Sequence, residues 1–436
     1  MNRNKINPLK RLLADRIQKH QKALSEWHLS YAKKAPPPFY CSVDLRDSGH
    51  KIAPVDSNLY PAGFNNLCPD DRRSAPPILR AQVEAIATHI AQDTPKKILI
   101  LPEAHTQNTF YIENLFYLRE LLINAGFETA IGWYPDAPSP ITLTSASGKI
   151  LEAHPLKIKD GRAMTDDFIP DWILLNNDFS SGYPKPLDSL RQPILPSHVL
   201  GWHSRKKSEH FTHYNHLAHE FASILDVDPW LIQIDTEEVG PVNFNQEEGI
   251  ESVANTAARI LERTQAAYAA HQVEQKPFVF IKNNHGTYGI GIMVIRSPDE
   301  LRQMNRRTKN KMSVGKNHLP IDSVVVQEGI PTATLVDRLA AEPVIYLAGC
   351  ELIGGFLRTN TEKNTEENLN SAGMVFKMLC MSDLRQGEEA TLELVYGSIA
   401  RISALATGLE LAEHLNLVNL VNPEAKTKSQ KTGALL

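Results

Sequence analysis

A lysine followed by three glycines is the part of the sequence whose residue types are best suited to chemistry. Lys282 follows the apolar residues 278–281, and the glycines come within the next nine positions. Glycine lets backbone amides approach phosphate oxygens closely, and a lysine anchored on a strand adds a localised positive charge. We therefore expect this segment to bind the phosphates of ATP. The expected phosphate loop comprises Lys282, Gly286, Thr287, Tyr288, Gly289 and Gly291.

The surroundings of this loop exclude two better-known phosphate motifs. A Walker loop needs Gly-Lys-Ser/Thr before a helix, and the dinucleotide fingerprint also opens a helix. Here the glycines lead into residues 290–295, which predict a second strand. A β-hairpin over the phosphates is therefore expected. Taken alone, an ordinary tight turn explains the glycines about equally well.

The elements that follow favour the nucleotide interpretation. Residues 324–330 contain a strand that ends in Gln327 and Glu328, residues 342–346 predict another, and residues 354–358 predict a third that ends in Arg358. A loop rich in asparagine, residues 367–373, comes next. This order resembles the ATP-grasp ligases, in which a lysine-bearing strand, a glycine loop, a Gln-Glu hinge, an arginine-ended strand and an Asn-containing loop surround the nucleotide.

Four further motifs resemble the small bacterial family of glutamate-cysteine ligases over nearly the whole chain. They are Ser-Val-Asp-Leu-Arg at residues 42–46, the Pro-Val-Asp to Asn-Asn block within residues 53–66, Leu-Asn-Asn-Asp at 175–178 and Gly-Trp-His-Ser-Arg-Lys-Lys-Ser at 201–208. The resemblance implies that ATP phosphorylates the γ-carboxylate of L-glutamate and that the amine of L-cysteine attacks the acyl phosphate, the first step of glutathione biosynthesis. Such an enzyme needs cations for the phosphates, anchors for two amino acids and a cleft that excludes water.

The resemblance also implies roles for the cations. Lys282 and Arg358 are the expected catalytic residues, the lysine on a phosphate and the arginine on a phosphate or the acyl phosphate. A second ATP-binding lysine is expected upstream, as Lys206 or Lys207. A solvated basic cluster that opens a helix explains these two lysines about equally well.

The hinge and the asparagine loop complete the expected nucleotide site. Gln327 and Glu328 would meet adenine and ribose, with a solvated strand end as the alternative. Mg²⁺ prefers carboxylate and amide oxygens, water and nucleotide phosphates. Many ATP-grasp ligases carry a Glu-x-Asn pair near their end, and none follows Gly373. The expected magnesium ligands are Glu366, Glu367, Asn368 and Asn370.

An amino-acid zwitterion needs an anion for its ammonium group and a cation or amides for its carboxylates. Residues of these types recur around Pro54 and Pro61, and again after the apolar run 172–175. The alternative is a polar loop whose Asp and Asn side chains cap their own turns. The number of unlike polar groups in one stretch favours the substrate interpretation. The expected substrate-binding residues are Asp44, Arg46, Asp56, Asn58, Asn65, Asn176, Asn177 and Asp178.

Four histidines and a basic run are better explained without a ligand. His210, His213, His216 and His219 recur every three residues, and this step rotates round a helix, so the four cannot all face one metal ion. Residues 302–316 are rich in Arg and Lys, and a solvated loop explains them better than a mobile phosphate lid.

A chain of 436 residues is long enough for two or three domains around a shared cleft. Residues 98–101, 108–125 and 127–133 predict a strand, a helix capped by Gly126 and a second strand, which together form a βαβ unit. Residues 172–175 predict another strand before a polar loop, and ligands bind at the carboxyl ends of such parallel strands. Residues 35–200 are therefore expected to form an open α/β substrate-binding domain.

Residues 201–421 are expected to form an ATP-grasp-like nucleotide-binding region. Helices are predicted at 209–225, 249–271 and 392–415, and a short strand at 231–234. The closely spaced strands at 278–282, 291–296, 323–327, 344–347 and 352–357 favour antiparallel pairing. A basic helix is predicted within residues 1–34 and a disordered tail at 422–436. The expected fold class is α/β and α+β, ATP-grasp-like, with an open α/β domain followed by antiparallel sheets.

Composition limits the partners of the chain. Hydrophobic residues make up 42% and charged residues 22%, as in soluble globular proteins. A net charge of -4 gives no reason to expect nucleic acid or a membrane surface, so small molecules are the expected partners, and a homo-oligomer stays an option. The four cysteines show no Cys-x-x-Cys spacing and are expected to be reduced and buried in a cytoplasmic protein.

Two other functions stay open. Glutathione synthetase or another ATP-grasp carboxylate-amine ligase would share the phosphate loop and differ in the residues that bind the substrates. A non-catalytic nucleotide-binding regulatory protein would keep the loop without chemistry. Arg358 and residues 366–370 disfavour this second function, because binding alone needs no stabilisation of an acyl phosphate. The missing second metal motif favours it weakly.

Overall fold

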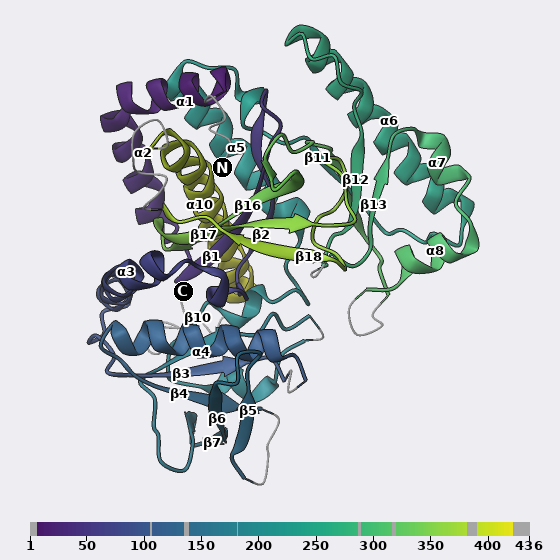
Figure 1. The fold of residues 1–436 in the computed structure, drawn as a ribbon. Coiled ribbons are helices and arrows are strands. Elements are labelled where there is room, and N and C mark those ends of the chain that lie inside the picture. Colours follow the sequence, from purple (N-terminus) through teal and green to yellow (C-terminus); the bar gives the residue numbers. More distant parts are fainter. Residues whose placement is uncertain are drawn as a thin grey trace.

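The computed structural model describes residues 7–104, 107–134, 139–180, 182–286, 289–315, 320–381 and 390–421. In Figure 1, helix α10 (Ala390–Val421) runs beside the largest sheet, a parallel sheet lies at one end of the molecule, and a smaller antiparallel sheet lies at its side. Two expected loop residues, Thr287 and Tyr288, and the expected tail at 422–436 lie outside the described residues.

Two sheets have six strands each, and the one with more residues, here called the largest sheet, is antiparallel with the order β18-β17-β16-β1-β2 and with β15 paired to β16. It joins two strands from the start of the chain to strands from its last third, and so crosses the expected division at residue 200. Its strands are β1 (Tyr40–Asp47), β2 (Ile52–Asn58), β15 (Leu335–Val336), β16 (Leu339–Ala348), β17 (Glu351–Asn360) and β18 (Met374–Met378).

The second sheet contains the expected βαβ unit, with order β10-β9-β3-β4-β6-β5 and parallel pairing except at β5. Helix α4 (Thr109–Asn124) begins where the Asn108 side chain accepts a hydrogen bond from Tyr111 N, and Gly126 follows its end at a φ of 91°. The strands are β3 (Lys97–Pro102), β4 (Glu128–Trp133), β5 (Ile141–Thr144), β6 (Ile150–Pro155), β9 (Trp172–Asn176) and β10 (Ile194–Leu195), and β7 (Lys157–Lys159) pairs with β8 (Arg162–Met164).

The third sheet has the order β11-β14-β12-β13 and contains the expected antiparallel hairpin. The strand expected at 231–234 is wrong, because residues 229–231 form a 3-10 turn capped by the Asp228 side chain. The carbonyls of Ile232 and Ile234 accept hydrogen bonds from the side chains of Tyr214 and Asn215 in the preceding helix instead of pairing with a neighbouring strand. The strands are β11 (Thr236–Val239), β12 (Val279–Asn283), β13 (Ile292–Ile295) and β14 (Val324–Glu328).

Two helical segments differ from expectation, and helix α3 (Pro69–His89) was not expected at all. The single amino-terminal helix is two helices that meet at His20, and the basic run 302–316 is largely helical instead of a loop. Among the described helices, none combines the length and the apolar character needed to cross a membrane. The remaining helices are α1 (Pro8–Lys19), α2 (Gln21–Lys34), α3 (Pro69–His89), α5 (Lys207–Leu225), α6 (Glu247–Ala270), α7 (Pro298–Arg302) and α8 (Arg306–Ser313).

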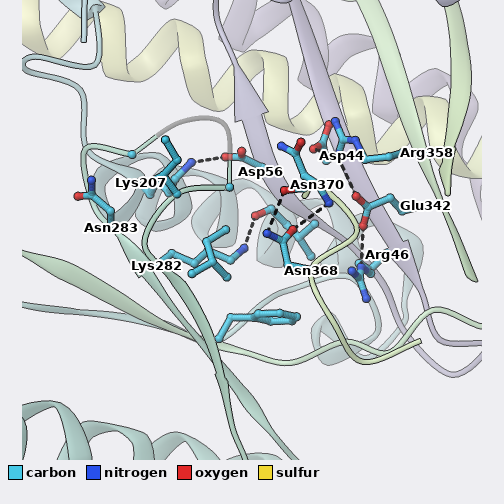
Figure 2. Close-up of a pocket in the computed structure, with 16 residues that line it drawn as sticks. Asp44, Arg46, Asp56, Lys207, Lys282, Asn283, Glu342, Arg358, Asn368 and Asn370 are labelled. Atoms are coloured by element: carbon cyan, nitrogen blue, oxygen red, sulfur yellow. Dashed lines mark hydrogen bonds and ion pairs between the residues drawn. The ribbon is translucent and has the colours of Figure 1, made fainter. Parts of the chain in front are cut away.

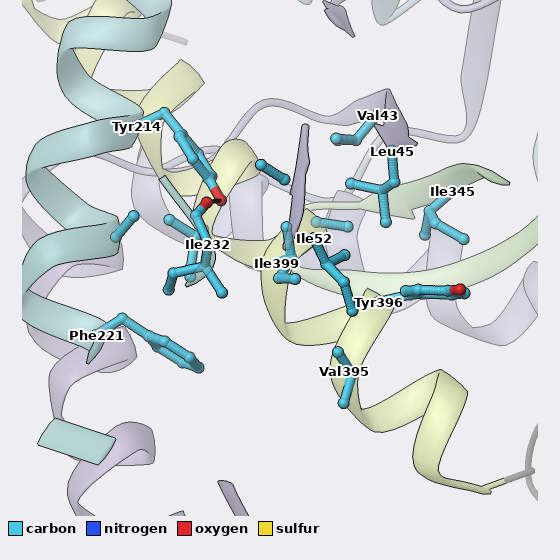
Figure 3. Packing of buried hydrophobic residues seen from close by; sticks show 14 of the residues in the cluster. Val43, Leu45, Ile52, Tyr214, Phe221, Ile232, Ile345, Val395, Tyr396 and Ile399 are labelled. Carbon is cyan, nitrogen blue, oxygen red and sulfur yellow. Dashed lines mark hydrogen bonds between the residues drawn. The ribbon is translucent and has the colours of Figure 1, made fainter. Parts of the chain in front are cut away.

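One apolar core joins helices α1, α2, α5 and α10 to a face of the largest sheet. Figure 3 shows Ile399 of α10 between Tyr214 and Phe221 of α5 on one side and Val43 and Leu45 of β1 on the other. Burial of such side chains is worth about 2 kcal/mol each, so this face of the sheet is firmly held. On the opposite face, the same strands place Tyr40, Tyr346 and Phe356 in a second apolar core, and their charged side chains line the pocket described below.

The cysteines correct another expectation. Cys68 and Cys380 form a disulfide across a separation of 312 residues, with Cα atoms 5.6 Å apart, while Cys41 and Cys350 are free. Cys68 precedes α3, which packs on β17, and Cys380 follows the neighbouring strand β18. Sequence spacing could not indicate this pair because only the tertiary fold brings the two segments together.

Candidate active site

A pocket lies where the largest sheet faces the third sheet (Figure 2). Strands β1, β2, β16 and β17 supply charged side chains from one side, and β12 with its glycine loop supplies the other side. Sixteen residues line it: Asp44, Arg46, Val55, Asp56, Lys207, Phe280, Lys282, Asn283, Gly286, Gly289, Ile290, Ile292, Glu342, Arg358, Asn368 and Asn370.

Strand geometry explains why charges meet here. Successive side chains of a strand point to opposite faces, so Val43 and Leu45 enter the apolar core while Asp44 and Arg46 face the pocket. Glu342 of β16 lies directly opposite Arg358 of β17 in the antiparallel register. Three adjacent strands therefore present their charges on one face.

Arg358 connects two buried carboxylates. Its Nη1 lies 2.5 Å from Asp44 Oδ2 and 2.8 Å from Glu342 Oε1. Two buried atoms of this group have no hydrogen-bond partner: Arg358 Nε, a donor, and Asp44 Oδ1, an acceptor. Buried polar groups are normally paired, so these two atoms are suited to bind a polar ligand.

Arg46 is occupied by contrast. Its Nε donates to Glu342 Oε2 at 2.9 Å, Nη1 to the carbonyl of Thr365 at 3.0 Å, and Nη2 to the carbonyl of Glu367 at 2.6 Å. The residue expected to bind a substrate carboxylate thus holds a protein segment.

The charges in the pocket shift one another's protonation. Burial raises the pKa of Asp44 to about 6, against the opposing charge of Arg358 and with help from Glu342 and Asp56. Burial also acts to raise the pKa of Glu342, but Arg46 and Arg358 lower it below its usual value. Asp44 is therefore the carboxyl of this group that titrates nearest neutrality.

Two lysines face these carboxylates from the other side. Lys282 Nζ donates to the carbonyl of Val55 at 2.8 Å and to Gln327 Oε1 at 2.7 Å, and burial lowers its pKa to about 8. Lys207 Nζ lies 2.5 Å from Asp56 Oδ1. Burial acts to raise the pKa of Asp56, but the charges of Lys207 and Lys282 lower it overall.

The glycine loop approaches the asparagine loop closely. Gly289 has a φ of 67°, and a Cβ at this position would lie 2.2 Å from the carbonyl oxygen of Asn370. Gly291 also has a positive φ, 69°. These two glycines are required by backbone conformation and, at Gly289, by space.

Several expected site residues lie away from the pocket lining. Lys206 is half-buried and pairs with Glu238 at 3.4 Å, and unlike its neighbour Lys207 it does not line the pocket. Gln327 accepts a hydrogen bond from Lys282 and does not line the pocket itself. Lys51 Nζ donates to the two carboxylate oxygens of Glu328 at 2.5 and 2.7 Å. Helix α5 begins at Lys207, which turns only the second lysine inward.

The polar residues near the parallel sheet and the first hairpin also lie outside the lining. Asn176 bonds with Asn114, Tyr40 and the carbonyl of Pro61, and is buried by them. The alternative of turns capped by their own side chains describes Asn177 and Asp178 within the rest of this group. Its members are Asn58, at the end of β2, Asn65, which bonds to Asn66, Asn177, which accepts from Phe179 N, and Asp178, which accepts from Ser180 N.

The expected magnesium ligands do not converge. Glu366 pairs with Arg296 at 2.7 Å and Glu367 with Lys363 at 3.0 Å, while Asn368 and Asn370 line the pocket. Among the residues that the structure describes, no group of three His, Cys, Asp or Glu side chains could hold a metal ion. The predicted set therefore does not fit magnesium in this conformation.

Sequence reasoning missed Glu342, Asn283 and Phe280. Glu342 begins the Glu-Pro-Val-Ile-Tyr segment, so it is a charged residue next to an apolar run. Only the pairing of its strand with the strand of Arg358 shows that it belongs to the site. Asn283 directly follows Lys282. Phe280 lies two residues before Lys282, on the same face of β12.

The histidines of α5 have separate partners, as their spacing predicts. His210 is buried against Glu410 and Ser403 of α10, His213 pairs with Glu413, and His216 pairs with Glu220 of its own helix.

Comparison with known proteins gives two informative similarities. A family model described as glutamate-cysteine ligase matches residues 14–411. The chain is also similar to the crystal structure of a protein provisionally named gamma-glutamylcysteine synthetase from Methylobacillus flagellatus KT, with 36% identity, coverage of 93% of this chain and 96% of that chain, and a TM-score of 0.83. Together with the parallel and antiparallel sheets, they confirm the expected α/β and α+β fold class.

Two other findings carry no weight. D-alanyl-alanine synthetase A from Vibrio cholerae O1 biovar eltor is 12% identical over 71% of this chain and 80% of that chain, and its TM-score of 0.33 is too low to bear on the fold. No curated protein matches the chain significantly.

Proposed function

Because the chain belongs to the glutamate-cysteine ligase family, we propose that the pocket joins L-glutamate to L-cysteine with ATP as the phosphate donor. A γ-carboxylate oxygen of glutamate attacks the γ-phosphorus of ATP, and ADP leaves. The amine of cysteine then attacks the acyl carbon, phosphate leaves, and the amine loses a proton. The product is γ-glutamylcysteine.

One observation carries this proposal: the pocket combines an unpaired donor, an unpaired acceptor and two lysines. Arg358 Nε and Asp44 Oδ1 are buried without partners, and Lys207 and Lys282 enter from the facing side. An amino acid offers an ammonium group to Asp44 and a carboxylate to Arg358. Phosphate charge is the natural partner of the lysines.

The roles of these residues follow from their charge. Lys282 and Lys207 neutralise phosphate oxygens as charge moves toward the leaving group, and Arg358 stabilises the acyl phosphate. Ionised Asp44 holds the ammonium group of glutamate. The remaining glycine-loop residues, Gly286 and Gly289, let backbone N–H groups reach the phosphates.

Magnesium enters this proposal from the family reaction alone. Of the predicted ligands, Glu366 and Glu367 form ion pairs and Asn368 is hydrogen-bonded to the backbone of Asn370, so no step is assigned to a metal here. ATP fits better, because the pocket gathers Lys207, Lys282 and a glycine loop that a Cβ would obstruct. The cytoplasm is the proposed location, since the reaction consumes free amino acids and ATP.

Release of ADP tests the reaction directly. With purified protein and ATP, we expect rapid ADP release only when glutamate and cysteine are supplied together, with γ-glutamylcysteine formed in equal amount. Release that ignores the amino acids would contradict the proposal. A requirement for a dipeptide plus glycine would identify glutathione synthetase activity, and nucleotide binding without turnover would identify a regulatory protein.

Replacing one lysine tests the phosphate assignment. Lys282→Met should lower kcat/KM by about 10² to 10³, the loss expected when a donor to developing charge is removed. Lys206→Met is the matched control, because this lysine is half-buried, pairs with Glu238 and lies outside the pocket lining; the activity of this variant should stay within about twofold of wild type. Circular dichroism confirms folding, and wild-type turnover in Lys282→Met would disprove the assignment.

A further inference from the structure

Residues 364–371, here called the platform, lie between the largest sheet and the glycine hairpin. On the sheet side, Arg46 donates to the backbone carbonyls of Thr365 and Glu367 at 3.0 and 2.6 Å. The same guanidinium is anchored on Glu342 at 2.9 Å and is 2% exposed. The platform is therefore fastened to the sheet through its backbone by a buried cation.

On the other side, the hairpin rests on the platform at two places. The backbone at Gly289 comes so close to Asn370 that a Cβ would lie 2.2 Å from the Asn370 carbonyl oxygen. Beyond β13, Arg296 Nη2 pairs with Glu366 Oε2 at 2.7 Å. In Figure 2, Arg46 lies beside Glu342, and the platform residues Asn368 and Asn370 lie between this pair and Lys282.

We infer that the platform positions the glycine hairpin for the nucleotide, and that Arg46 acts as a positioning residue that holds the platform. The inference rests on the proposed function and deepens it. All three nitrogens of the guanidinium already donate to protein oxygens. Arg46 therefore acts on ATP through residues 365–370 instead of binding a substrate carboxylate. Arg358, with its free Nε, is the arginine left for the substrate.

The exposed ion pair between Arg296 and Glu366 gives the cleanest test, because removing one partner leaves no unpaired charge in the protein interior. Binding of a non-hydrolysable ATP analogue is measured by calorimetry without amino acids. Glu366→Gln and Arg296→Gln should each raise the dissociation constant about threefold, and the exchanged pair Arg296→Glu with Glu366→Arg should restore it. Arg302→Gln is the control, since its exposed pair with Glu251 lies away from the platform. An unchanged dissociation constant in both single variants would overturn the inference.

Arg46→Lys tests the buried anchor. The lysine keeps the charge opposite Glu342 but cannot reach both carbonyls, so the analogue's dissociation constant should rise at least about tenfold while KM for glutamate changes less than about threefold. The reverse pattern would make Arg46 a substrate anchor and overturn the inference. If this variant does not fold, the exposed pair decides. Nucleotide binding without amino acids does not depend on which amino acids are joined, so failure of the proposed function would appear separately in ADP release.

Discussion

Two clusters of buried charges lie within this fold, and only one of them opens on a pocket. Both consist of arginines and carboxylates that are nearly inaccessible to solvent, and in both burial and ion pairing shift the pKa values. The pocket cluster comprises Asp44, Arg46, Glu342 and Arg358. The helix cluster, between α5 and α10, comprises Arg205, His210 and Glu410.

The helix cluster is satisfied within itself. Arg205 donates to both oxygens of Glu410 at 2.9 Å and to the carbonyl of Ser57 at 2.8 Å. His210 bonds to Glu410 at 2.8 Å and to Ser403 at 3.0 Å. Among the described residues, no charged atom of this cluster lacks a partner. Its charges fix how α10 packs on α5.

The pocket cluster differs in what it leaves unpaired. Arg358 Nε and Asp44 Oδ1 are buried without partners. Perturbed pKa values mark functional and structural ion pairs alike. Between these two clusters, burial and pKa shifts do not distinguish the pocket from the structural cluster, whereas unpaired buried charged atoms do.

The strongest test of this difference is Arg358→Lys. Lysine keeps a positive charge between Asp44 and Glu342 but removes the free Nε, so kcat/KM should fall by about 10² while the melting temperature changes little. Steady-state kinetics and a thermal melt measure both. A large loss of stability with normal kcat/KM in the folded protein would make Arg358 structural, like Arg205.

Acid should weaken glutamate binding next. The pKa of Asp44 is raised to about 6, so its acceptor charge is present above that pH and is lost as the pH falls below it. KM for glutamate should rise by up to about tenfold per pH unit below 6, because the ammonium group loses its counter-charge. A pH series of KM with Asp44→Asn as control checks this. A flat profile in wild type would separate Asp44 from substrate binding.

Glu410→Gln should have the smallest effect on catalysis. Activity of the folded protein should stay within about threefold of wild type, while the free energy of unfolding falls by about 3 kcal/mol because Arg205 is left as an uncompensated buried charge. The pKa of Glu410 is lowered from 4.5 to about 2, so its contribution is present above pH 4.5 and is lost as the pH falls toward 2. Urea unfolding at pH 7 and pH 3 should show a smaller difference between the two proteins at the lower pH. A hundredfold loss of kcat/KM would place this cluster in the catalytic machinery.

Local patterns predicted much of the framework. The βαβ unit around α4, the hairpin of β12 and β13 and the helices α5, α6 and α10 follow from periodicity, capping and glycine positions. The strand at 231–234 failed because apolar residues anchored to a helix look like a strand in sequence. The prediction that Cys68 and Cys380 are reduced failed because their spacing in the sequence does not indicate that they meet in the fold.

The candidate site was predictable only in part, for a related reason. Lys282, Arg358, Asp44 and Asp56 were expected and do line one pocket. Asn176 has the same chemical character, yet its hydrogen bonds are used within the fold. Lys206 and Lys207 are adjacent, and the start of α5 turns only the second one toward Asp56.

The sequence by itself determined which groups this protein has for phosphate and amino-acid chemistry, and its motifs determined the family. Residue type and local spacing suffice for that because they set charge, strand pattern and glycine conformation. The tertiary structure alone decided which polar atoms remain free. Arg46 and Arg358 look alike in sequence, but all three nitrogens of Arg46 donate to protein oxygens, whereas Nε of Arg358 has no partner. The loop of Lys282 and the glycines forms a site only together with a free donor such as Arg358 Nε, and long-range strand pairing brings that donor to the loop.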